Sequence, residues 1–264
     1  MNKHIEIYGL REQEDAFGNN IYDSYHSGNY YSGYEIEERC DGRFILYGDS
    51  NSYFEAFEEW NPIQKKLAPK INGRILDVGC GGGKHALFFQ ESGNKVFAMD
   101  NSPKALEICR LRGILNTILC DVEHLYRLDK SLIFDHIIFW GNNLGLFQSR
   151  DFFIYLMSVL ENYTHDNSLL YLESMSPYSE GFLDQDTVDY VNQNLIQKKL
   201  GGQMHLRVRY KKFVTPWTDY LFLSVDELKT LLSKTNWSIN NIYEDNESNQ
   251  YIVVLKKNKI ISDL

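Results

Sequence analysis

The fold expected for this chain follows from residues 75–85, which read ILDVGCGGGKH. A short apolar strand over Arg74–Val78 runs into glycines, and a helical pattern follows over Lys84–Ser92. Glycines between a strand and a helix let the backbone turn tightly and approach a ligand where a Cβ atom would collide. The helix start adds free N–H groups and the positive end of a dipole. The stretch therefore predicts a strand–turn–helix unit that binds a ligand.

Three classes of ligand compete for this turn, beside a plain tight turn that binds nothing. A P-loop needs Gly where Val78 stands and a hydroxyl residue where His85 stands. A dinucleotide fingerprint needs its third glycine at the position of Lys84. An adenosyl ligand without phosphates fits better, because Asp77 at the strand end repels a pyrophosphate but tolerates a cationic ligand.

Strands and helices alternate along the following hundred residues, which indicates β-α units and a largely parallel sheet. Ser102 followed by Pro103 is a strong helix start, and Ser224 with Glu227 three residues later forms a capping box. The further strands are expected at Lys95–Met99, Asn116–Cys120, Phe134–Trp140, Ser168–Glu173, Ser238–Tyr243 and Tyr251–Lys256, and the helices at Pro103–Leu111, Asp151–Asn162 and from Ser224.

Four motifs, each at the carboxyl end of an expected strand, resemble those of the class I S-adenosylmethionine-dependent methyltransferases. The first is Asp/Glu-x-Gly-x-Gly-x-Gly at residues 77–83. Asp100 stands where the family acid holds the ribose hydroxyls, and Asp121 where the family accepts from the adenine amino group. Residues 139–143 resemble the end of the fourth strand, which lines the methyl-transfer site.

The resemblance implies an α/β, Rossmann-like sheet of seven mostly parallel strands in the order 3-2-1-4-5-7-6, with strand 7 antiparallel and helices on both faces. It implies an N-terminal lid at residues 1–60 and a methyltransferase domain at 61–264, with an acceptor-side insertion at 176–223 after strand 5. Its cofactor is S-adenosyl-L-methionine. The residues expected at the cofactor are Asp77, Gly79, Cys80, Gly81, Gly83, Asp100, Asn101, Asp121, Val122, Gly141 and Asn142.

The implied reaction is direct displacement of the sulfonium methyl group by a small-molecule acceptor, with no metal required and no catalytic base identified. Candidates for the acceptor pocket, by location, are Trp60, Asn143, Tyr178, Arg209 and Trp217. Several of the cofactor and acceptor candidates also have a structural alternative, among them Arg209, which suits the exposed face of a strand. Trp60 favours packing of a helix on the sheet, Asp121 suits a helix cap, and Asn142 suits a backbone turn. A catalytically silent methyltransferase-like module for binding or regulation is the competing function.

Composition narrows the class of protein. Of the 264 residues, 43% are hydrophobic and 24% charged, which is ordinary for a globular chain. The 27 basic and 36 acidic residues give a net charge of −9, which argues against a nucleic-acid partner. No apolar stretch approaches the roughly 20 residues of a membrane helix. The four cysteines form no Cys-x-x-Cys pair, so we expect a reduced, cytoplasmic protein. The oligomeric state is left open.

Overall fold

The computed structural model describes residues 2–28, 34–178, 184–245 and 248–258. By their internal contacts these residues form two compact units. The first comprises Met1–Leu128 and Met204–Asp219, and the second comprises Asp129–Gln203 and Tyr220–Leu264.

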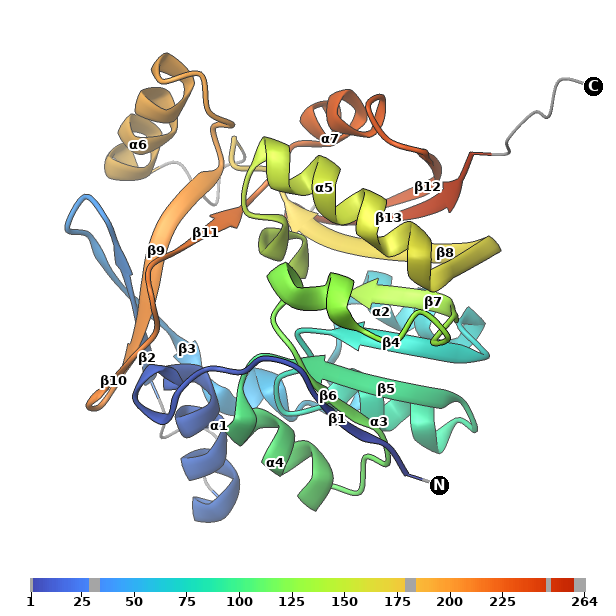
Figure 1. Ribbon diagram of the computed structural model, residues 1–264. Coiled ribbons are helices and arrows are strands. Elements are labelled where there is room, and N and C mark those ends of the chain that lie inside the picture. The colour runs from blue at the N-terminus through green and yellow to red at the C-terminus, as the bar shows by residue number, and fades with distance from the viewer. Residues whose placement is uncertain (1, 29–33, 179–183, 246–247, 259–264) are drawn as a thin grey trace, which may run out of the picture. The chain divides into compact units, whose positions relative to one another are not determined.

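The first unit holds a parallel row of strands in the order β1-β6-β5-β4 (Figure 1). Strands β6, β5 and β4 lie in the order 3-2-1 that the sequence led us to expect. Strand β1 is an additional edge strand, which pairs in parallel with β6. The bounds are β1 His4–Glu6, β4 Arg74–Val78, β5 Lys95–Asp100 and β6 Thr117–Leu119.

Side-chain caps fix where helices α1 and α4 of this unit begin. Helix α4 starts at Pro103, and the Ser102 side chain accepts from the backbone N–H of Ala105, as the sequence predicted. The carboxylate of Asp15 caps α1 and also accepts from the Ser102 hydroxyl, which ties the starts of α1 and α4 together. The bounds are α1 Ala16–Ser27, α2 Pro62–Leu67, α3 Lys84–Glu91 and α4 Pro103–Leu111, with 3₁₀ helices η1 Glu12–Glu14, η2 Ser50–Tyr53, η3 Phe57–Glu59, η4 Ala68–Lys70 and η5 Val122–Arg127.

Residues 1–60 are more regular than expected, because part of them joins a second, antiparallel sheet. Its strand order is β10-β9-β2-β3, so that the N-terminal hairpin pairs with a segment far along the chain. The first compact unit therefore contains residues from both sides of the domain boundary expected at residue 60. The lid role of residues 1–60 stays a prediction. The bounds are β2 Tyr34–Arg39, β3 Phe44–Asp49, β9 Gln203–Tyr210, β10 Phe213–Val214 and β11 Thr218–Leu221.

The second unit holds the strands β7-β8-β13-β12, with β7 parallel to β8 and β13 antiparallel to β8. This order corresponds to the expected run 4-5-7-6. Trp237 anchors the closing hairpin, because its indole N–H donates to the carbonyl of Met157 in α5 over 3.1 Å. The bounds are β7 Phe134–Phe139, β8 Thr164–Met175, β12 Trp237–Asp245, β13 Gln250–Lys257, α5 Arg150–Leu160, α6 Gln185–Ile196, α7 Val225–Leu232, η6 Asn143–Phe147 and η7 Glu161–Tyr163.

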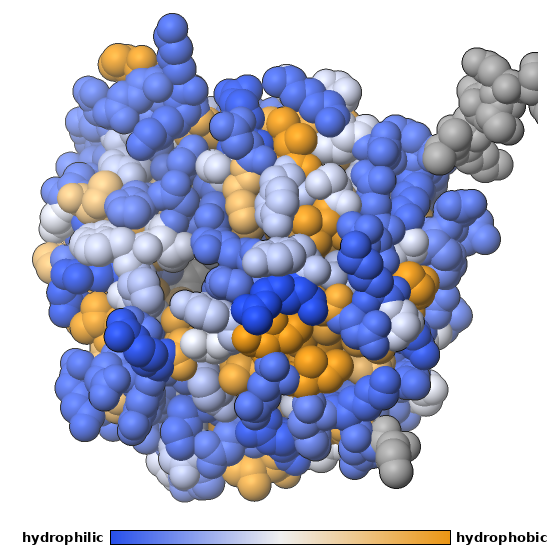
Figure 2. All heavy atoms as spheres, in the orientation of Figure 1, coloured by the Kyte–Doolittle hydropathy of each residue, from blue (hydrophilic) through white to orange (hydrophobic). Residues whose placement is uncertain are grey.

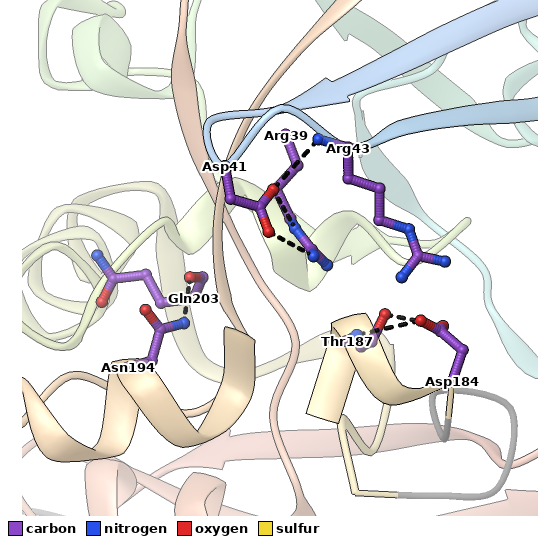
Figure 3. Close-up of polar contacts among 7 residues, drawn as sticks. All are labelled: Arg39, Asp41, Arg43, Asp184, Thr187, Asn194 and Gln203. Atoms are coloured by element: carbon purple, nitrogen blue, oxygen red, sulfur yellow. Dashed lines mark hydrogen bonds and ion pairs between the residues drawn. The ribbon is translucent and has the colours of Figure 1, made fainter. Parts of the chain in front are cut away.

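Local polar contacts define the hairpin turn of the first unit and helix α6 of the second (Figure 3). In the hairpin turn, the Arg39 guanidinium donates twice to the carboxylate of Asp41, over 2.9 and 2.7 Å. Helix α6 begins at its cap Asp184, which accepts from Thr187. Near its end, the Asn194 amide donates to the backbone carbonyl of Gln203 over 2.8 Å. The hairpin turn and both ends of α6 are thus fixed by hydrogen bonds between residues that are close in sequence.

The face shown in Figure 2 is mostly hydrophilic, with apolar residues in separate groups among polar ones. Within the part of the chain that the structure describes, no helix has both the length and the apolar character that crossing a bilayer demands.

Candidate functional site

The glycine turn joins β4 to α3 in the conformation that glycine favours. The φ angles of Gly79, Gly81 and Gly83 are 72°, 52° and 80°, in the region that residues with a Cβ rarely adopt. The backbone N–H groups of Gly79 and Cys80 donate to the carbonyl of Met99 over 2.9 and 3.0 Å. The turn is therefore attached to the carboxyl end of the neighbouring strand β5.

Asp100, the last residue of β5, lies directly against this turn. One carboxylate oxygen accepts from the backbone N–H of Gly81 over 2.9 Å, and the other accepts from Ser102 over 2.9 Å. Burial raises the pKa of Asp100 to about 6, although these two hydrogen bonds act in the opposite direction. The structure thus brings two residues that the sequence placed at the cofactor, Asp100 and Gly81, into direct contact.

Asp77 is the second acid at the turn, and it is buried, with 2% of its surface exposed. Its carboxylate accepts a backbone hydrogen bond from Ala86 in α3, while the Oδ2 atom is buried without a partner in the described structure. Burial, followed by the charge of Asp100, raises the pKa of Asp77 to about 7. A cationic ligand beside the turn would stabilise both carboxylates, whereas a pyrophosphate would be repelled. The charge of the site therefore favours a cationic ligand over a phosphate.

Asn101 and Asp121 meet at the ends of β5 and β6. The Asn101 amide donates to Asp121 Oδ2 over 2.8 Å, and Asp121 Oδ1 accepts from the backbone N–H of Glu123 over 2.9 Å. Asp121 therefore caps η5, as its structural alternative predicted, and also fixes Asn101. The ring of His124 stacks on Tyr8 nearby, with ring centroids 4.1 Å apart. No periodicity in the sequence indicated this aromatic pair.

The protein's own side chains account for part of the glycine requirement. A Cβ atom at Gly81 would lie 2.8 Å from the Tyr53 ring, and one at Gly82 would lie 2.8 Å from the Tyr53 carbonyl oxygen. At Gly83, a Cβ atom would lie 2.9 Å from the sulfur of Cys109. The sequence attributed the absence of side chains to ligand approach. The structure shows that η2 and α4 also need it.

In the second unit, the turn after β7 holds the other residues predicted to lie at the cofactor. Gly141 and Asn142 have φ angles of 73° and 63°, so both adopt the left-handed conformation. The Gly141 N–H donates to the carboxylate of Glu173 over 2.8 Å, and the Tyr220 hydroxyl donates to the carbonyl of Asn142 over 2.7 Å. The side-chain oxygen of Asn142 is buried without a partner in the described structure, and Asn143 begins η6. This amide can accept a hydrogen bond from a ligand.

Trp60 lies in the protein core, as its structural alternative predicted, and its role in the acceptor pocket stays a prediction. Trp60 is 2% exposed, and its ring contacts those of Phe88 and His85 at centroid distances of 5.1 and 4.6 Å. His85 is also buried, 3.3 Å from the Gln64 side chain, and burial holds its pKa well below the usual range. Both rings pack the segment before β4 against α3, which is the structural role that the sequence favoured for Trp60.

The arginines of β9 are held by a carboxylate on the neighbouring strand β2. Arg207 donates twice to Glu38, over 2.8 and 2.9 Å, and Arg209 donates to the same carboxylate. Trp217 is 39% exposed; its ring stacks on His205, and the Arg207 guanidinium lies 4.5 Å from its centroid. Glu38 therefore offsets much of the positive charge expected to attract an anionic acceptor.

Tyr178 lies in the second unit and is 44% exposed. Its hydroxyl donates to the carboxylate of Glu227 over 2.7 Å. Burial of the hydroxyl and the hydrogen bond to Glu227 raise the pKa of Tyr178, so the group stays neutral near pH 7.

Comparison with known proteins agrees with this geometry. Residues 75–162 match a family model described as a methyltransferase domain. A ubiquinone biosynthesis O-methyltransferase from Ralstonia nicotianae is 33% identical over 29% of this chain and 34% of its own length. An uncharacterized methyltransferase from Staphylococcus carnosus is 26% identical over 55% of this chain and 67% of its own length. The chain thus spans between about a third and two thirds of these relatives.

A solved structure extends the comparison to nearly the whole chain. It is a SAM-dependent methyltransferase from Bacteroides fragilis in complex with S-adenosyl-L-homocysteine, with a TM-score of 0.79 and 20% identity. The match covers 95% of this chain and 98% of that one, and it shows a common fold. Residues 75–162 thus match a methyltransferase-domain model, and the chain shares the α/β fold of this solved structure.

Proposed function

We propose that the protein is an S-adenosylmethionine-dependent methyltransferase that acts on a small-molecule acceptor in the cytoplasm. One observation carries the proposal: two acids, the buried Asp77 and the partly buried Asp100, flank a glycine turn, and Asp77 Oδ2 has no partner in the described structure. This environment favours a cationic nucleoside over a dinucleotide or a triphosphate. The names of the relatives, which are methyltransferases, support the same reading.

In this proposal the cofactor supplies an activated methyl group, and the chain's own residues bind and orient it. Asp100 accepts from the ribose hydroxyls, while Asp121 and Val122 face the adenine and Asn101 fixes Asp121. The backbone of the glycine turn lies along the amino-acid portion, near the carboxyl group of Asp77. The proposed cofactor residues are Asp77, Gly79, Cys80, Gly81, Gly83, Asp100, Asn101, Asp121, Val122, Gly141 and Asn142.

The acceptor side of the proposal draws on the half-exposed candidates Asn143, Tyr178, Arg209 and Trp217. Aromatic side chains suit a planar or apolar acceptor. The contribution of the protein is to exclude water and to align the acceptor atom with the methyl group. The proposal assigns no metal and no catalytic base.

Calorimetric titration with S-adenosylhomocysteine and S-adenosylmethionine tests the assignment. We expect dissociation constants in the micromolar range or tighter, and weaker binding of NAD and ATP. Heat with NAD or ATP but none with the two nucleosides would reverse the assignment. A labelled methyl donor incubated with a metabolite extract then separates an enzyme, which transfers label, from a silent binding module, which does not.

A further inference from the structure

The 3₁₀ helix η2 lies on the glycine turn of the first unit. The ring of Tyr53 lies 2.8 Å from the place of a Cβ at Gly81, and its carbonyl oxygen lies 2.8 Å from the place of one at Gly82. The next residue, Phe54, lies under the guanidinium of Arg112 at 5.3 Å from the ring centroid, and Arg112 also donates to the Gly82 carbonyl. The position of η2 therefore affects the shape of the turn directly.

A buried polar network holds η2 at both ends, at Ser50 and at Tyr53. Ser50 shares a hydrogen bond with Ser24, which donates to the Asn20 side-chain oxygen over 3.5 Å. The Asn20 amide donates to Glu35 Oε1 over 2.8 Å. The Tyr53 hydroxyl lies 3.4 Å from both oxygens of the same carboxylate. The network thus starts and ends on η2, and Asn20 and Glu35 connect the two ends through α1 and β2.

Glu35 is a carboxylate at a buried position, where an apolar side chain would be sufficient for packing alone. It is 2% exposed, on the face of β2 that it shares with Glu37, and Asn20 is fully buried beside it. Burial raises the pKa of Glu35 to about 7, and the charge of Glu37 adds to the shift. An apolar side chain would fill the same space without the desolvation cost of a carboxylate. What a carboxylate offers here is a directed acceptor for Tyr53 and Asn20.

We infer that Glu35 is a positioning residue for the cofactor: through Tyr53 it keeps η2 seated on the glycine turn in the form that binds the nucleoside. The inference rests on the proposed function, because it assumes that the glycine turn is where the cofactor binds. Loss of the Tyr53 hydroxyl or of the Glu35 acceptor leaves the ring and strand in place but frees η2 to move. Part of the cofactor's binding free energy is then used to return η2 to its position on the glycine turn, so the affinity of the protein for the cofactor falls.

A double-mutant cycle tests the inference by calorimetry with S-adenosylhomocysteine at pH 8. We expect Tyr53→Phe and Glu35→Leu each to raise the dissociation constant by about three- to tenfold, the range of one lost hydrogen bond. The double variant should be no weaker than the weaker single variant, because both changes break one contact. Glu35→Gln, which keeps an acceptor oxygen, should restore most of the affinity.

Tyr22→Phe is the matched control. Tyr22 on α1 packs against the same hydrophobic cluster as Tyr53, but its ring contacts are with His26 and Lys104. The Tyr22→Phe variant should therefore bind S-adenosylhomocysteine as tightly as the unmodified protein. If Glu35→Leu does not fold, Tyr53→Phe alone, compared with Tyr22→Phe, carries the test, and an unchanged dissociation constant in Tyr53→Phe overturns the inference.

The outcomes separate the inference from the function on which it rests. If the unmodified protein binds S-adenosylhomocysteine but Tyr53→Phe binds equally well, or the two changes add fully, the positioning role is refuted. If thermal stability falls in the variants while affinity is unchanged, Glu35 is a purely structural residue, and the inference fails in that case too. If the unmodified protein binds no nucleoside, the proposed function itself is wrong.

Discussion

Replacement of Asp100 by alanine tests the centre of the site. Its carboxylate accepts from the backbone N–H groups of Gly81 and Ser102, and in our proposal it also accepts from the ribose hydroxyls. Hydrogen bonds to a charged group contribute about 1.5–3 kcal/mol each, and water replaces part of what is lost. We therefore expect Asp100→Ala to weaken cofactor binding by about 1–3 kcal/mol, which is about a 5- to 150-fold rise in the dissociation constant.

The assay is calorimetric titration with S-adenosylhomocysteine at pH 8, where Asp100, with a pKa of about 6, is ionised. Asp100→Asn is the matched variant, because it keeps one acceptor oxygen for the Gly81 N–H but removes the charge. Its affinity should lie between those of the unmodified protein and Asp100→Ala. Thermal unfolding of each variant shows whether the glycine turn has survived the change.

An unchanged dissociation constant in a folded Asp100→Ala protein would refute this reasoning. The ribose would then have to bind elsewhere, and the contact between Asp100 and Gly81 would serve the turn alone. Equal losses in Asp100→Ala and Asp100→Asn would instead show that charge, rather than hydrogen-bond geometry, sets the affinity.

Two predictions on stability follow from the same turn. Buried acids with raised pKa values, Asp77 at about 7 and Asp100 at about 6, hold protons more tightly when folded than when unfolded. The free energy of unfolding should therefore fall as pH rises from about 4 to about 8, and Asp77→Asn should make that slope shallower in urea titrations. Gly83→Ala should destabilise the protein by at least about 1 kcal/mol more than Gly93→Ala, because both have positive φ but only Gly83 lies against Cys109. Equal losses in the two glycine variants, measured by urea titration, would exclude the packing contribution.

The elements that could be predicted from the sequence are those that depend on short-range sequence signals, such as helix caps. The Ser102-Pro103 start and the capping box of Ser224 and Glu227 both appear in the structure, with the Ser224 N–H donating to Glu227 over 2.9 Å. Caps and strand–helix alternation depend on neighbours a few residues away, so they can be read without knowing the fold. The strands of each unit also follow the order that the family resemblance implied.

Residues 1–60 could not be predicted in the same way, because their structure depends on distant partners. Strand β2 pairs with β9, and Ile36 lies opposite Arg209, more than 170 residues along the chain. Helix α1 carries the buried polar residues Asn20 and Ser24, which give it a weak apolar pattern. The buried polar residues of α1 are explained only by the tertiary structure, in which the Asn20 amide donates to Glu35 of β2.

The candidate site shows the same division between local and distant causes. Asp77 and Asp100 could be proposed because each lies at the end of a strand, whereas the sequence leaves Trp60 open between the core and the acceptor pocket, and the structure places its side chain in the core. Tyr53 carried no motif, and its contact with the glycine turn depends on η2 being held by α1 and β2. A residue that acts through tertiary position alone leaves no spacing signal in the sequence.

The glycine motif therefore has more than one physical cause. Gly81 and Gly82 are required by Tyr53, and Gly83 by Cys109, before any ligand is considered. A glycine pattern by itself thus indicates a turn with close neighbours, which a P-loop, a dinucleotide fold and a methyltransferase all need. The ligand class follows instead from charge, because the buried, incompletely paired carboxylate of Asp77 beside Asp100 discriminates against phosphates. The acids, more than the glycines, make the nucleoside of a methyltransferase the ligand that fits this turn.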